Sequence, residues 1–336
     1  MTRAAGRPDG RLERRPAERQ QRGRLRRTLL AGLVAAAVVL PVSAAASPDV
    51  PAPAPAALAE ATALPDRYEA NRANLAEAAR MAREAGRTGR AAKLEAMGAD
   101  GTARFLAFDG RGKGRAVEVL GDLEGADRIA VLVPGSDTTL DTYQRFRAGA
   151  VALQQRLLAG HPRSAVVAWL GYDTPGTVSS TVLSTDRADA AAAELGPFLE
   201  RLGRGTAPGA RLSLLCHSYG SVVCARTSTG PAVTDMALFG SPGTGAGSAA
   251  GLPTGARVWA GRGGADWIGH VPHVRLGGLG FGTDPVDPAF GARPFAAGPG
   301  GHSDYLKPGT ASLDSLARIV LGTAPVAPTD PEVSHA

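Results

Sequence analysis

The sequence predicts an α/β fold: a single domain with a mostly parallel central sheet flanked by helices. Two observations predict it. Apolar runs such as 129–133 and 212–216 do not alternate with polar residues, which is typical of strands buried on both faces. From residue 103 onward these runs alternate with longer amphipathic segments, which indicates right-handed βαβ units.

The expected elements follow from this alternation. The strands are expected at 104–108, 115–120, 129–133, 165–169, 212–216, 235–239 and 257–260. The helices are expected at 66–85, 141–158, 183–202, 219–228 and 311–321. Asp66 is the expected N-cap of the first helix and Gly86 its stop. The first two strands are close in sequence and should pair as an antiparallel hairpin at the sheet edge.

The charge of the chain is concentrated at its N-terminus. The whole chain carries a net charge of +6, but residues 1–44 contain ten arginines against three acidic residues. Those 44 residues therefore carry +7 and the remainder −1. The basicity does not indicate a nucleic-acid partner, since no basic stripe with interleaved aromatic residues follows.

The same N-terminus has the three parts of an export signal. Four arginines, the last two being Arg26 and Arg27, precede the uncharged run 28–48, whose centre at 29–40 is apolar. Small residues then follow the breaker Pro41. This order predicts a cleavable export signal, and the paired arginines suit the twin-arginine type. The alternative is an uncleaved membrane anchor, because the uncharged run of 21 residues is just long enough to span a bilayer.

The chain is therefore expected to have four parts. Residues 1–46 form the export signal or membrane anchor, and 47–64 form a linker rich in proline and alanine. Residues 65–322 form the folded domain, and 323–336 form a Pro-rich tail that is expected to be disordered. The protein is expected to be secreted or on the cell surface, and membrane-anchored if the signal is not cleaved.

A strand-turn-helix segment carries the first chemical signal. The run 212–223 enters a tight turn at Ser218 and continues as a helix. A nucleophile elbow has this form, with small residues two before and two after the serine, because the turn is sharp. Gly220 fits this pattern, and Cys216 stands where a glycine is usual. Ser218 is thus the candidate nucleophile, and the amide N–H of Tyr219 a candidate oxyanion donor.

A second oxyanion donor is expected after an early strand. The run 129–133 leads into Pro134-Gly135, followed by Ser136 and Asp137. Gly135 allows the backbone to approach a substrate closely, and the N–H of either Ser136 or Asp137 could donate. The alternative is that Pro-Gly only makes a turn.

The base and its acid should follow the serine in the order acid, then histidine. His217, beside the nucleophile, is expected to be structural, and His161 and His335 lie outside this order. Of the three remaining histidines, His270, His273 and His302, the last lies in a Gly-rich loop before the final helix, where a base could reach over the sheet edge. Asp266 ends a Gly-rich loop after the last expected strand and is the candidate acid. Asp284, with Asp287 behind it, is the rival.

Two weaker motifs do not predict cofactor chemistry. His270-x-x-His273 has no third metal ligand at convincing spacing. The glycines at 243–247 lack both the G-x-G-x-x-G spacing and the Lys-Ser/Thr of a P-loop. No metal and no cofactor are expected.

Taken together, these motifs show a resemblance to a family. Residues 121–135, the run Trp169-Leu-Gly-Tyr-Asp173, the elbow, and Gly301-His302-Ser303-x-Tyr305 resemble the actinobacterial α/β hydrolases once catalogued as a domain of unknown function, the DUF1023 group. The resemblance spans residues 65–322. It implies an α/β-hydrolase fold in which Ser218, Asp266 and His302 occupy the triad positions, and it implies no substrate.

The expected function is that of an exported serine hydrolase. It would cleave a carboxylic ester, for example of a lipid or of an acylated cell-envelope component, through an acyl-enzyme. The partners would be a small-molecule or lipid ester and the membrane or cell envelope. The alternatives are an acyltransferase with the same triad and a non-catalytic binding protein on a hydrolase scaffold.

The two cysteines are expected to meet. Cys216 ends the strand that enters the elbow, and Cys224 lies under two helical turns beyond Ser218 on the helix that runs back across it. An exported protein can form a disulfide between them. The alternative is two small buried thiols, which pack well without a bond.

Overall fold

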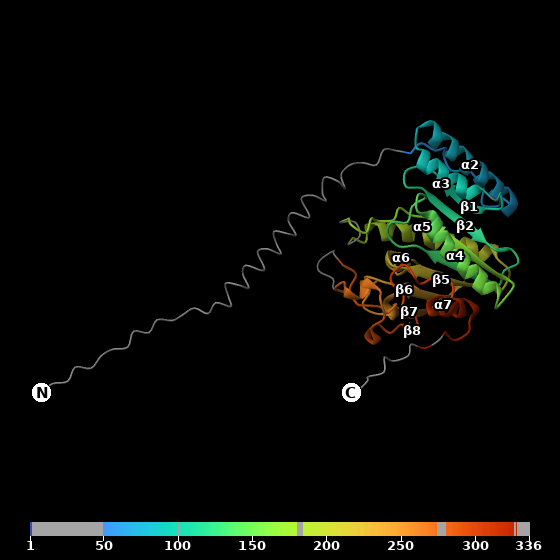
Figure 1. The fold of residues 1–336 in the computed structure, drawn as a ribbon. Coiled ribbons are helices and arrows are strands. Elements are labelled where there is room, and N and C mark those ends of the chain that lie inside the picture. The colour runs from blue at the N-terminus through green and yellow to red at the C-terminus, as the bar shows by residue number, and fades with distance from the viewer. Residues whose placement is uncertain (2–49, 100, 180–183, 274–279, 326, 328–336) are drawn as a thin grey trace. The chain divides into compact units, whose positions relative to one another are not determined.

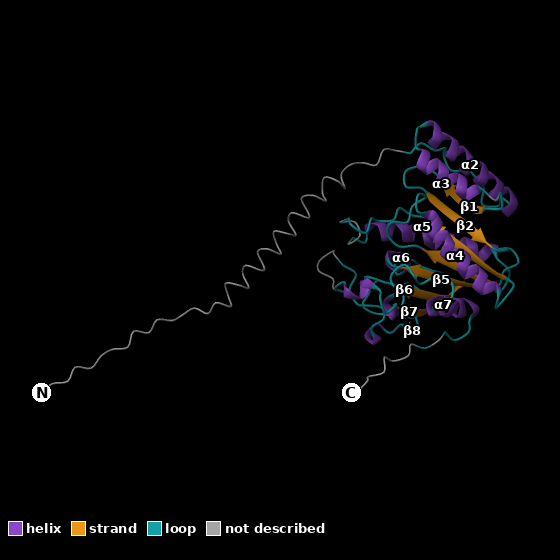
Figure 2. Cartoon of the chain, viewed as in Figure 1, coloured by secondary structure: helices purple, strands orange, loops and turns teal. Residues whose placement is uncertain are grey.

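An eight-stranded sheet forms the centre of the fold, with helices on both faces (Figure 1, Figure 2). The strands are β1 (Arg104–Asp109), β2 (Arg115–Leu120), β3 (Arg128–Val133), β4 (Ser164–Leu170), β5 (Arg211–His217), β6 (Val233–Phe239), β7 (Arg257–Gly261) and β8 (Arg293–Pro294). The helices are α2 (Leu64–Glu84), α3 (Thr88–Gly98), α4 (Tyr143–Leu158), α5 (Asp186–Gly205), α6 (Tyr219–Cys224) and α7 (Ala311–Leu321). The described residues also contain three 3-10 turns: η2 (Ala249–Gly251), η3 (Trp267–His270) and η4 (Pro288–Phe290).

The structure is a computed structural model that describes residues 1, 50–99, 101–179, 184–273, 280–325 and 327. The expected export segment beyond Met1, the first residues of the linker and most of the C-terminal tail lie outside the described residues. Residues 50–63 of the linker contain one turn and no helix or strand. They contact the domain, since Asn74 Nδ2 donates to the carbonyl of Ala54 at 2.7 Å.

The sheet is mostly parallel, as the sequence predicts. Its order is β1-β2-β4-β3-β5-β6-β7-β8. The β1–β2 and β2–β4 pairs are antiparallel, and every other neighbouring pair is parallel. The parallel strands therefore end at one common edge, and the loops that follow them meet there.

Both faces of the sheet are buried because alternate residues of a strand point to opposite sides. In β3, Ile129, Val131 and Val133 belong to the core cluster that includes residues of α5 and α6. Ala130 and Leu132 belong to the cluster that includes residues of α4 and α7. This arrangement explains why the strand sequences do not alternate between polar and apolar residues.

The seven expected strands are all present, and the antiparallel hairpin of β1 and β2 is confirmed. The sequence pattern predicts neither α3 nor β8, which has only two residues. The N-cap prediction is wrong: α2 begins at Leu64 after Ala63, and Asp66 lies in its first turn. There its carboxylate still faces the positive end of the helix dipole. Helices α2 and α3 pack against β1 through a cluster that includes Leu75, Leu94 and Phe105.

None of the helices in the described parts of the chain is long and apolar enough to cross a membrane.

Candidate active site

Ser218 lies on a strained turn between β5 and α6. Its backbone has φ 54° and ψ −127°, and Ser218 and Asp137 are the only non-glycine residues with positive φ in the described chain. Such a conformation is unfavourable for a residue with a side chain, so the surrounding structure must hold it. The amide of Ser218 donates to the carbonyl of Phe239 on the neighbouring strand at 3.0 Å. The turn leaves Ser218 at the edge where the parallel strands end.

Two glycines make room for this turn. A Cβ atom on Gly220 would lie 2.7 Å from the carbonyl oxygens of both Val133 and Pro134, so α6 can pass close to the end of β3 only with glycine there. A Cβ atom on Gly135 would lie 2.6 Å from the Cβ of Ser218. The turn after β3 therefore passes directly beside the serine.

A disulfide spans the elbow. Cys216 and Cys224 are both fully buried, and their sulfurs are bonded in the structure with a Cα–Cα separation of 6.4 Å. The bond joins the strand that enters the turn to the last residue of α6.

The structure brings together Ser218, His302 and Asp266, which come from three separate loops. The Nε2 atom of His302 lies 2.9 Å from Ser218 Oγ. Its Nδ1 atom lies 2.9 and 3.1 Å from the two carboxylate oxygens of Asp266. A carboxylate can only accept, so Nδ1 carries the proton and Nε2 is free to take the hydroxyl proton. This row of groups can deprotonate a serine.

Asp266 is held as a carboxylate. Its side chain is fully buried, and burial alone would raise its pKa. Hydrogen bonds from His302, from the hydroxyl of Tyr305 and from the amide of Ile268 outweigh burial and lower the pKa below its ordinary value. A buried carboxylate that keeps its charge can stabilise a positively charged imidazole.

Tyr305 links the loop of the acid to the loop of the histidine. Its hydroxyl donates to Asp266 Oδ2 at 2.5 Å and accepts from the amide of Gly263 at 3.0 Å. The sequence motif around His302 includes Tyr305, but the sequence alone indicates no role for this residue. A tyrosine three residues after the histidine was the available signal.

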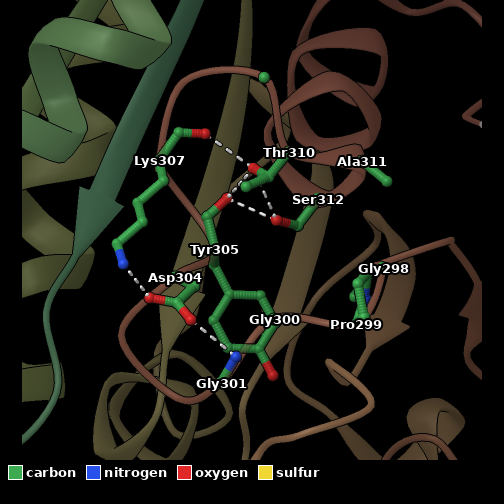
Figure 3. A pocket seen from close by; sticks show the side chains of 12 residues that line it. Gly298, Pro299, Gly300, Gly301, Asp304, Tyr305, Lys307, Thr310, Ala311 and Ser312 are labelled. Carbon is green, nitrogen blue, oxygen red and sulfur yellow. Dashed lines mark hydrogen bonds and ion pairs between the residues drawn. The ribbon is translucent and has the colours of Figure 1, made fainter.

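The loop that carries His302 is also held by hydrogen bonds and an ion pair made by residues that follow the histidine in the sequence. Figure 3 shows the carboxylate of Asp304 between the amide of Gly301, at 2.9 Å, and Lys307, at 2.6 Å. Ser312 at the start of α7 donates to the carbonyl of Tyr305 at 2.6 Å. These groups border a cavity of about 290 Å³ lined by residues of the segment 297–312, with no contribution from Ser218. His302 and Asp266 do not line it either, so this cavity is not the space in front of the serine.

Two backbone amide groups adjacent to the turn at Ser218 have no hydrogen-bond acceptor among the described residues. They belong to Ser136, after β3, and to Tyr219, at the first position of α6. Asp137 cannot serve as expected, because its amide already donates to the carbonyl of Pro175 at 3.0 Å. Its carboxylate accepts from the amide of Thr177 at 3.1 Å, so Asp137 shapes the turn instead. Of the two alternatives after Gly135, Ser136 is therefore the remaining donor.

The rival acid lies in another network. Asp284 forms an ion pair with Arg262, and its Oδ2 atom is 3.7 Å from Nε2 of His273. Asp287 accepts from the amide of Ala289 at 2.8 Å and thereby caps η4. Neither carboxylate contacts His302 in the structure. Within the described residues, no group of three or more His, Cys, Asp or Glu side chains is arranged to hold a metal ion.

The chain is similar in sequence to proteins of mycobacteria. The chain is 32% identical over 253 residues to the uncharacterized protein Rv2079 of Mycobacterium tuberculosis, a match that covers 63% of this chain and 37% of that protein. It is 34% identical over 142 residues to the uncharacterized protein Mb0988c of Mycobacterium bovis, which covers 37% of this chain and 51% of that protein. The chain thus spans about half or less of the length of these curated relatives.

Among solved structures, esterase PE8 is similar with a TM-score of 0.42 and 18% identity, covering 61% of this chain and 96% of that one. Esterase LipW from Mycobacterium marinum is similar with a TM-score of 0.40 and 16% identity, covering 73% of this chain and 88% of that one. The model of a family described as Alpha/beta hydrolase matches residues 109–276, half of the chain. The protein is therefore a member of this alpha/beta hydrolase family.

Proposed function

We propose that the protein is a serine hydrolase that cleaves carboxylic esters through Ser218, His302 and Asp266. One observation carries the proposal: a serine in a strained elbow conformation has its hydroxyl 2.9 Å from the Nε2 atom of a histidine. Ser218 is one of two non-glycine residues with positive φ in the described chain, and strained backbone of this kind gathers at functional sites. The buried carboxylate on the far side of the histidine supports the same role.

The reaction would proceed in two steps. Oγ of Ser218 attacks the ester carbonyl carbon while its proton passes to Nε2 of His302. The tetrahedral intermediate collapses, the bond to the alcohol oxygen breaks, and the imidazolium returns the proton to that oxygen. Water then attacks the acyl-enzyme in the same way, and the carboxylic acid leaves. The ionised Asp266 stabilises the imidazolium in both steps.

The amides of Ser136 and Tyr219 would stabilise the negative oxygen of each intermediate. Both belong to segments whose positions are set by close packing around Gly135 and Gly220. Donors held in place before the reaction cost no reorganisation when the charge develops, and removing one such donor typically lowers turnover by about 10²–10³-fold.

The test uses an active-site label and an ester series. A fluorophosphonate should label the wild-type protein and leave Ser218→Ala unlabelled. p-Nitrophenyl esters of graded acyl length should be hydrolysed by the wild type, and Ser218→Ala should lose about 10³-fold or more of that activity. Labelling or hydrolysis that persists in the folded Ser218→Ala protein would refute the proposal. Adding alcohols to the same assay distinguishes hydrolysis from acyl transfer, since a transferase would form new esters.

We further propose that the chain is exported and acts on the cell surface or outside the cell, with an ester of a lipid or of the envelope as its substrate. The arginine-rich start, the apolar run and the small residues that follow support this proposal. The mycobacterial relatives support the narrower assignment to the actinobacterial DUF1023 group. Cell fractionation with N-terminal sequencing of the mature chain tests export: protein found only inside the cell with an intact Met1 would refute it.

A further inference from the structure

Trp267 is unusual in its exposure and its position. Four large apolar side chains are exposed in the described chain: Met1, Leu158, Val178 and Trp267. Trp267 is 46% exposed and directly follows Asp266. A large aromatic ring left open to water beside a reactive site is a typical feature of a surface that contacts a ligand.

The local backbone fixes this exposure. The carboxylate of Asp266 accepts from the amide of Ile268 at 2.9 Å and so caps η3. Ile268 is buried, which anchors the turn in the core. Trp267 lies between the buried Asp266 and the buried Ile268, and its own side chain is exposed to solvent. Trp267 is therefore held at the surface by the same hydrogen bond that supports the acid.

The indole ring contacts the histidine of the site. The ring centroids of Trp267 and His302 are 4.8 Å apart, with an angle of 48° between the rings. In the proposed reaction, His302 gives its Nε2 proton to the oxygen of the departing alcohol, which must lie within hydrogen-bonding distance of that atom. The carbon atoms attached to this oxygen must then lie near the ring that packs against His302.

We propose that Trp267 forms the subsite for the alcohol portion of the ester and selects esters of apolar alcohols. This inference rests on the proposed function and adds the class of leaving group to it. In the acylation step the Ser218 Oγ–carbon bond forms and the carbon–oxygen bond to the alcohol breaks. The proton of Ser218 passes through His302 to the alcohol, which leaves across the face of Trp267. The acyl-enzyme that remains no longer contains the alcohol.

The experiment compares esters that share one acyl group, methyl butanoate and hexyl butanoate, by the release of butanoic acid. Both substrates give the same acyl-enzyme, so any general damage to His302 cancels in the ratio of their kcat/KM values. The wild type should favour the hexyl ester, and Trp267→Ala should lower this ratio about tenfold, the size expected for losing contact with two or three methylene groups at partial burial. Trp267→Phe should keep most of the preference. Deacylation should be equally fast from both esters in every variant.

The matched control is Leu158→Ala. Leu158 is 45% exposed, but it ends α4, which returns to the opposite edge of the sheet. The ratio should not change in this variant. As a second measurement, 1-hexanol should slow fluorophosphonate labelling of the wild type and lose this effect in Trp267→Ala. An unchanged ratio in folded Trp267→Ala would overturn the inference while leaving the hydrolase proposal intact. Absence of any Ser218-dependent release from either ester would overturn both.

Discussion

The Nε2 atom of His217 lies 2.8 Å from the backbone carbonyl oxygen of His302. A carbonyl oxygen can only accept, so the imidazole of His217 donates. The two rings are 4.9 Å apart, and burial lowers the pKa of His217 to about 3. His217 directly precedes the proposed nucleophile, Ser218. Its neutral ring thus holds the backbone of His302, the residue whose side chain contacts Ser218. His217 is expected from the sequence to be structural, and this hydrogen bond describes what that role is.

His217 should make the stability of the fold depend on pH. Its pKa in the folded state lies below its value of about 6.5 in an unfolded chain. Unfolding therefore takes up a proton between these values, so the stabilisation is complete above about pH 6.5 and is lost as the pH falls toward 3. Residue 217 should contribute a slope of up to about 1.4 kcal/mol per pH unit. The free energy of unfolding of the wild type and of His217→Phe, measured in urea from pH 7 to pH 5, gives this slope. If the two free energies change with pH in parallel, the prediction is contradicted.

Tyr305→Phe should weaken the site without removing any proposed reactive group. The variant loses the hydrogen bond to the charged Asp266, which is worth about 1.5–3 kcal/mol at neutral pH. The pKa of Asp266 is lowered in the fold, so this contribution is present above its unfolded value of about 3.9 and is lost as the pH falls through the folded value. The stability gap between wild type and variant should therefore narrow below about pH 4. A gap that stays constant with pH would show that packing, not the charge of Asp266, accounts for it.

The identity of the acid can be tested with two matched substitutions. Asp266→Asn keeps the shape of the side chain but removes the charge that stabilises the imidazolium, and should lower turnover by up to ~10⁴-fold. Asp284→Asn breaks the ion pair with Arg262 and should have little effect on turnover, because Asp284 does not contact His302. Turnover of a p-nitrophenyl ester by both folded variants decides between them. The opposite ranking would assign the acid to Asp284.

The sheet could be predicted from sequence because its strands are buried on both faces, and uninterrupted apolar runs such as Leu212–Cys216 record that burial directly. Strand β8 could not, since a two-residue pairing leaves no periodic pattern. Helix α3 could not be predicted either, because it follows α2 after a short turn at Gly86 and its buried residues, which include Ala91 and Leu94, are few.

The residues of the site could be predicted only where a single residue type in a continuous stretch of sequence indicates the role. The elbow at Ser218 is such a case, since the strand, turn and helix adjoin in sequence. The choice between Ser136 and Asp137 as oxyanion donor could not be predicted in this way. It depends on Pro175, 38 residues beyond Asp137, whose carbonyl accepts the hydrogen bond from the amide of Asp137. The contacts of Tyr305 and Trp267 likewise depend on how two distant loops cross, which no local pattern records.

The disulfide bond across the elbow should stabilise the fold. Cys216 and Cys224 are fully buried and bonded to each other, and the closed loop is short, with a sequence separation of 8. The entropy lost by the unfolded chain is then modest, and the bond should stabilise the fold by about 2–3 kcal/mol. Because the disulfide joins β5 to α6 on either side of Ser218, this stabilisation acts directly on the strained turn.

Protein isolated from an oxidising compartment and alkylated without reduction should show no modified cysteine by mass spectrometry. Unfolding in urea should occur at a lower midpoint when a reductant is present. The double variant Cys216→Ala/Cys224→Ala should have nearly the same midpoint as the reduced protein, apart from the stability lost with the packing of the two sulfur atoms. Two alkylated cysteines in the unreduced sample, or a midpoint that reductant does not change, would rule out the bridge.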